Sequence, residues 1–177
     1  MRKAKVILIL IILFCIIYFL QTNFFSWFNI GGIMPNLFVI LVLFIGLFVG
    51  NKVGGILGIL FGIVLDLTIG HYVGVSSVFL ALIGLLGEYF DKNFSKDSRA
   101  TIIIMSAGST VIYELGIYVS KILIMGVNAE FLTFTLTVLV EILFNVLLII
   151  IIYPLMKKLG YYIEDAFKGK KILTRYF

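Results

Sequence analysis

Long apolar stretches, separated by short polar segments, dominate the sequence. They cover about residues 6–28, 37–50, 53–69, 72–89, 100–125 and 131–155. The hydrophobic fraction is 62%, the mean hydropathy is +1.20 and only 13% of the residues are charged, against roughly a quarter in soluble domains. A soluble fold cannot bury this much apolar surface, whereas a bilayer acts as a solvent for it. The sequence therefore predicts an all-α polytopic membrane protein with six transmembrane helices in one bundle.

The distribution of basic residues predicts the orientation of these spans. All but one of the 14 basic residues fall at the N-terminus, at Lys52, in segment 92–99 or in the C-terminal tail. A cytoplasmic N-terminus places all of them on the cytoplasmic side, as the positive-inside rule requires, and leaves Lys121 near the outer end of the fifth span. We expect both termini in the cytoplasm, a transmembrane bundle over 1–156 and a basic amphipathic cytoplasmic tail over 157–177. Topology alone explains the net charge of +5, so it implies no nucleic acid partner.

Glycine recurs at every fourth residue through the second and third stretches and beyond. The members of this series are Gly46, Gly50, Gly54, Gly58, Gly62, Gly70 and Gly74. Glycines at this spacing lie along one face of an apolar helix and allow another backbone to come close. A turn at 51–52 divides the series between two helices. The glycines therefore either pack helices within the bundle or receive the span of a partner protein.

A second local signal precedes the 37–50 stretch, where Pro35 and Asn36 stand just before the apolar run. Proline is well tolerated at the start of a helix because its missing N–H would have no partner there. We therefore expect the second span to begin at these two residues. At 14 residues this stretch is short for a span, which needs about 17 or more.

Five polar residues within or near the spans are candidates for function: Asp66, Glu114, Glu141, Asn145 and Lys121. Ionisable groups in a membrane are costly and face the bundle interior or a partner. Asp66 takes the place of a glycine in the four-residue spacing between Gly62 and Gly70, and lies within one helical turn of the outer surface. We expect it either to hold the loop that follows or to bind a partner.

Glu114 and Glu141 lie nearer the middle of their spans and are expected to face the bundle interior. Lys121 shares a helix face with Glu114, and Asn145 lies one turn after Glu141. We interpret these residues as contacts between helices or subunits, with a proton relay or ion site as the alternative.

No residue pattern predicts catalysis. The chain has one histidine, His71, and one cysteine, Cys15, which lies inside an apolar run. Neither lies in a nucleophilic set or at metal-ligand spacing, and the glycine series does not follow a strand as phosphate-binding loops do. We expect no enzyme activity, no metal and no cofactor.

The order of residues in the first half resembles the rod shape-determining protein MreD family. The matching features are Pro35-Asn36 before an apolar span, the glycines from Gly50 to Gly62, then Asp66-Leu67, Gly70 and Gly74. The resemblance implies a noncatalytic subunit of the bacterial cell-wall elongation machinery in the plasma membrane. It implies four partners: the single-span protein MreC, a peptidoglycan glycosyltransferase and transpeptidase pair, and the actin-like MreB filament on the cytoplasmic side.

The same family is similar in fold to the membrane substrate-binding subunits of energy-coupling-factor vitamin transporters. An alternative function is therefore binding of a small solute. A solute-binding subunit needs a pocket with a few convergent polar groups, whereas a scaffold needs close helix packing and exposed surfaces for partner helices. Fold analogy does not decide between these functions.

Overall fold

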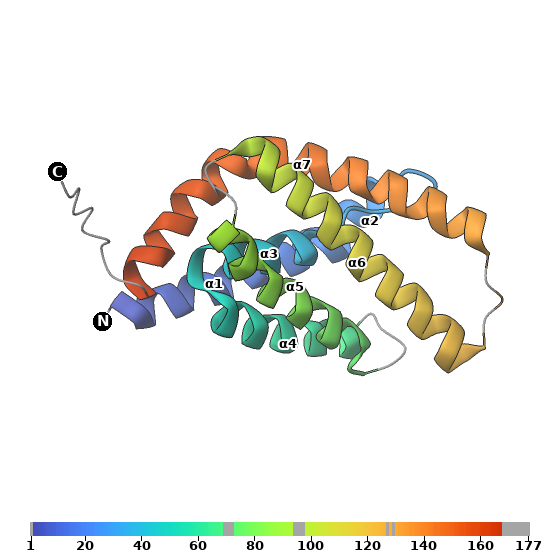
Figure 1. The fold of residues 1–177 in the computed structure, drawn as a ribbon, viewed down its shortest axis with the longest axis horizontal. Helices are drawn as coiled ribbons and strands as arrows, with labels where there is room; N and C mark the ends of the chain where they lie inside the picture. Colours follow the sequence, from blue (N-terminus) through green and yellow to red (C-terminus); the bar gives the residue numbers. More distant parts are fainter. Residues whose placement is uncertain (1, 69–72, 94–97, 127, 129, 168–177) are drawn as a thin grey trace.

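The chain forms an all-helical bundle (Figure 1). The computed structural model describes residues 2–68, 73–93, 98–126, 128 and 130–167. Its helices are α1 (Arg2–Phe19), the π-helical turn η1 (Leu20–Phe24), α2 (Phe25–Trp27), α3 (Leu37–Val49), α4 (Asn51–Thr68), α5 (Val75–Asn93), α6 (Arg99–Met125) and α7 (Phe131–Phe167). Figure 1 shows α6 and α7 side by side, and α4 beside α5.

Helix α3 is the centre of the bundle. Each of its 13 residues is buried, and it contacts α1, α4, α5, α6 and α7. Its sequence suits this position, because a helix that is apolar on every face can pack against apolar neighbours on every face. At a rise of 1.5 Å per residue α3 is about 20 Å long, shorter than the ~30 Å hydrocarbon core.

Three helical segments in the described part of the chain are long and apolar enough to cross a membrane: Lys5–Trp27, Arg99–Ile124 and Phe131–Phe167. Two shorter apolar helices, Leu37–Val49 and Val75–Gly87, accompany them. These features fit a helical membrane bundle, and the count of six spans stays a prediction.

The break between α3 and α4 lies at Gly50, one residue before the turn expected at 51–52. Gly50 has φ 118°, a left-handed conformation that costs glycine little and other residues much more. Asn51 already belongs to α4, and the Gly54 N–H donates to the Gly50 carbonyl at 2.8 Å. A single residue therefore reverses the chain.

Helix α7 continues past the expected end of the last span at residue 155. Pro154 lies inside it, where proline removes a backbone hydrogen bond and bends the helix, and Figure 1 shows α7 bent in its C-terminal part. Gly160 and Ile163 beyond this bend are buried. A Cβ atom on Gly160 would come within 2.6 Å of the Phe48 ring. Residues 157–167 of the expected tail thus pack near the C-terminal end of α3, and 168–177 lie outside the described residues.

The glycine series packs α3 and α4 against α5. A Cβ atom on Gly54 would lie 2.7 Å from the Gly84 carbonyl oxygen, and one on Gly46 would overlap the same atom. Gly58 faces the backbone at Leu80, and Gly62 faces that at Ser77. The three helices approach so closely that four members of the series have no room for a side chain. Their contacts lie within the bundle.

Candidate functional site

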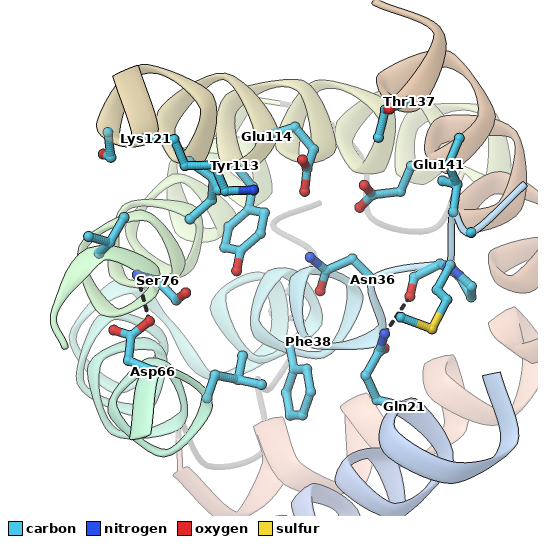
Figure 2. Close-up of a pocket in the computed structure, with 18 of the residues that line it drawn as sticks. Gln21, Asn36, Phe38, Asp66, Ser76, Tyr113, Glu114, Lys121, Thr137 and Glu141 are labelled. Atoms are coloured by element: carbon cyan, nitrogen blue, oxygen red, sulfur yellow. Dashed lines mark hydrogen bonds between the residues drawn. The ribbon is translucent and has the colours of Figure 1, made fainter. Parts of the chain in front are cut away.

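A cavity of about 910 Å³ lies at one end of the bundle, where α3 and α5 begin and α4 and α6 end (Figure 2). Its wall is formed by Gln21, Thr22, Ser26, Gly31, Gly32, Ile33, Met34, Pro35, Asn36, Phe38, Leu65, Asp66, Val75, Ser76, Tyr113, Glu114, Ile117, Ser120, Lys121, Ile124, Thr137 and Glu141. Pockets of this size and mixed lining are the usual binding sites for small molecules.

Asp66 forms one side of the cavity and holds the start of α5. Its Oδ2 accepts hydrogen bonds from the Gly74 N–H at 2.7 Å, the Ser77 N–H at 3.4 Å and the Ser77 hydroxyl at 3.2 Å, while Oδ1 accepts from the Ser76 N–H at 3.1 Å. The first N–H groups of a helix have no partner within it, and the helix dipole favours a negative charge there. The Asp66 carboxylate supplies hydrogen-bond acceptors for these N–H groups and a negative charge at the start of α5.

The start of α3 is held by three amide side chains. Asn36 is the N-cap, whose Oδ1 accepts from the Val39 N–H at 3.2 Å. Gln21 accepts from the Leu37 N–H at 3.0 Å and donates to the Pro35 carbonyl at 2.8 Å. Figure 2 shows the Gln21 bond at the edge of the cavity.

The third amide, Asn145, lies fully buried behind this cap. Its Oδ1 accepts from the Asn36 N–H at 2.8 Å, and its Nδ2 donates to the Thr110 hydroxyl at 2.8 Å. Thr110 in turn donates to the Ser106 carbonyl at 3.0 Å. Asn145 thus connects α3, α6 and α7 through one buried side chain.

Glu114 of α6 and Glu141 of α7 point into the cavity from adjacent helices, and their carboxyl groups face each other (Figure 2). Glu141 is 5% exposed. Its Oε1 is buried and has no hydrogen-bond partner of standard geometry in the described part of the chain. Because buried polar atoms in native proteins are nearly always hydrogen-bonded, an exception calls for an explanation.

Lys121 lies on the cavity wall two turns after Glu114, and its side chain is exposed. It is near enough for its charge to act on Glu114. The cavity therefore has an acidic pair shared by α6 and α7, and a basic group on the same face of α6 as Glu114, with apolar side chains such as Ile117 between Glu114 and Lys121. No group of three or more histidine, cysteine, aspartate or glutamate residues that could hold a metal is found among the described residues.

The structure brings six of the residues singled out from the sequence to this one cavity: Pro35, Asn36, Asp66, Glu114, Lys121 and Glu141. Asn145 lies directly behind it. Gly74, with φ 108°, forms the turn that Asp66 holds. Gly70 and His71 lie outside the described residues.

Sequence reasoning missed Gln21, Ser76, Tyr113 and Thr137, which also line the cavity. The sequence does carry a signal for two of them. Tyr113 directly precedes Glu114, and Thr137 lies one helical turn before Glu141. Gln21 and Ser76 carry none, since polar residues next to a loop are common.

The fold and the site together define a helical membrane protein whose intramembrane polar groups meet at one end of the bundle. Residues 1–159 match the family described as rod shape-determining protein MreD. The chain belongs to this family, which links it to the determination of rod shape. No curated protein and no solved structure matches the chain.

Proposed function

We propose that this protein is a noncatalytic scaffold of the cell-wall elongation complex in the bacterial plasma membrane. It binds an MreC-like single-span protein and the peptidoglycan glycosyltransferase and transpeptidase pair through helix packing, and so controls cell shape. The observation that carries this proposal is the family match over residues 1–159. The comparisons give the transporter alternative no support.

The basic residues support six spans with both termini cytoplasmic. In this orientation the cavity faces the outer side of the membrane, because it lies where α6 ends and α7 begins. The opposite end of the bundle faces the cytoplasm, where segment 92–99 and the basic tail are available to the MreB filament. Anionic lipid attracts the same basic groups.

The glycine contacts narrow down where a partner span packs. Gly46, Gly54, Gly58 and Gly62 already meet α5, so they offer no open face to another protein. Gly108 of α6 differs, because it is exposed and a Cβ atom there would meet nothing within 4 Å. A glycine on an open apolar face is where a second helix can approach closely, and we place the partner contact there.

Co-purification from native membranes tests this placement. Gly108→Leu adds a side chain at a position where a Cβ atom meets nothing within 4 Å, so we expect a normal yield of folded protein and loss of the MreC-like and synthase partners. Val78→Leu is the control, because Val78 is also exposed, at 63%, but lies on α5. Unchanged recovery of the partners with Gly108→Leu would count against the contact. Recovery of a coupling ATPase in place of wall-synthesis proteins would count against the function.

A further inference from the structure

The buried Oε1 of Glu141, which has no hydrogen-bond partner of standard geometry among the described residues, indicates that the cavity is built for a ligand. Two carboxyl groups that face each other repel when both are ionised, and a proton or a cation between them removes the repulsion. The capping amides and Asp66 accept hydrogen bonds from backbone N–H groups at the starts of α3 and α5. Glu114 and Glu141 cap no helix in the described part of the chain. They lie close enough to share a hydrogen bond, and Glu141 also lies near the Asn145 amide, so a cavity occupant would compete with these contacts for the two carboxyl groups.

The shape of the site favours an organic ammonium over a metal ion. Calcium takes six to eight oxygen ligands, and magnesium takes a near-octahedral set, whereas the described residues bring together no three metal-binding side chains of the usual kinds. An ammonium group needs three acceptors. The cavity offers Glu114, Glu141 and the Thr137 hydroxyl, which lies one turn before Glu141 on the same face of α7 (Figure 2).

Lys121 adds a requirement for an anionic group in the same ligand. It follows Glu114 by seven residues, about 10 Å along the helix at 1.5 Å per residue. Helical side chains lean toward the N-terminus, so the Lys121 ammonium is directed back toward the acidic pair. A ligand that carries its anionic and cationic groups a few bonds apart matches this arrangement. The cavity, at about 910 Å³, has ample room for both.

We propose that the cavity binds a zwitterion, with a primary ammonium held between Glu114 and Glu141 and a phosphate placed near Lys121. Phosphoethanolamine has this chemistry. It has two sources, the headgroup of phosphatidylethanolamine and the free compound in the outer aqueous space.

Thermal unfolding of the full chain in a neutral detergent tests the site. Phosphoethanolamine and phosphatidylethanolamine are each titrated. The free compound is compared with phosphocholine, whose nitrogen carries no N–H, and with glycerol phosphate, which has no amine. The lipid is compared with phosphatidylcholine and phosphatidylglycerol of the same acyl chains. We expect the unfolding temperature to rise only with the primary amine. A rise with the free compound assigns the aqueous source, and a rise with the lipid alone assigns the bilayer source.

The variants Glu114→Gln and Glu141→Gln keep the side-chain shape and remove one of two like charges, so we expect the fold to remain intact. Each is expected to weaken binding of the amine roughly tenfold or more, since hydrogen bonds to charged groups are among the stronger ones. Glu130→Gln is the matched control, because Glu130 is exposed before α7 and outside the cavity wall.

Three results would overturn the proposal. The first is equal stabilisation by phosphocholine or glycerol phosphate, and the second is an unchanged preference for the amine in Glu141→Gln. The third is no response to either amine source, which would leave a proton shared by the two carboxyl groups as the explanation of the pair.

Discussion

Substitution of Asp66 distinguishes two roles for its carboxylate: accepting hydrogen bonds that hold the fold, or supplying a charge that function requires. The carboxylate accepts three backbone N–H groups and one hydroxyl at the start of α5. Asp66→Ala removes all four hydrogen bonds, and water in the adjoining cavity can replace only those that reach it. In Asp66→Asn the amide oxygen can take the place of Oδ2 and keep the bonds from Gly74 and Ser77. Only the bond from Ser76 is lost, because two N–H donors then face each other.

The two substitutions should therefore lower the free energy of unfolding by different amounts. Each unsatisfied buried donor costs about 1–3 kcal/mol, and loss of an N-cap alone costs about 0.5–2 kcal/mol. Gly74 and Ser76 are only half-buried beside the cavity, so the lower end of these ranges applies. We expect Asp66→Ala to destabilise the protein by about 2–4 kcal/mol and Asp66→Asn by about 1 kcal/mol.

The assay is reversible unfolding in mixed micelles by titration with sodium dodecyl sulfate, followed by circular dichroism. Asp165→Ala is the control, because Asp165 is an exposed acid near the end of α7, and it should leave the transition unchanged. Co-purification of partners is measured on the same variants. If Asp66→Asn were as damaging as Asp66→Ala, in stability or in assembly, the hydrogen-bond account would be refuted. The charge of Asp66 would then be required in its own right.

Two further predictions concern helix packing and the buried hydrogen bonds of Asn145. Gly84→Val should reduce the yield of folded protein severely, because a Cβ atom at Gly84 overlaps the backbone of Gly54, whereas Gly108→Val should give a normal yield by fluorescence-detected size exclusion. Asn145→Leu should lower the unfolding free energy by about 2–3 kcal/mol because it leaves the Asn36 N–H and the Thr110 hydroxyl without their partner. Thr110→Val removes both hydrogen bonds of the Thr110 hydroxyl but keeps the one from the Asn36 N–H to Asn145, and should lower it by less.

The apolar stretches predict most of the helices, because helices are the simplest way to satisfy backbone groups in lipid. The break at Gly50 escaped prediction because Gly50 falls on the same four-residue spacing as the helical glycines, and spacing does not reveal a left-handed φ. The amphipathic pattern of the tail was recognised, but its continuity with α7 through Pro154 escaped prediction. Proline usually ends a helix, and only the burial of Gly160 and Ile163 against the core explains why this one continues.

The candidate site could be predicted in part. Asp66, Glu114 and Glu141 stand out because acids are rare in apolar stretches, but a single sequence does not say that they share one cavity. The glycine series likewise predicts close packing without naming the neighbour. Gly84 and Gly87 of α5 complete that contact, and their spacing of three residues does not follow the four-residue pattern.

The short length of α3 explains why polar groups gather at one end of the bundle. A helix of about 20 Å cannot place both of its ends at the surfaces of a ~30 Å hydrocarbon core, so its first N–H groups need hydrogen-bond partners from the protein. Gln21, Asn36 and Asn145 satisfy them from the sequence before α3 and from α7. The space above the short helix, between taller neighbours, becomes the cavity. Glu114 and Glu141 face that space and accept no backbone N–H of α3 among the described residues. We therefore explain their position by a ligand in the cavity.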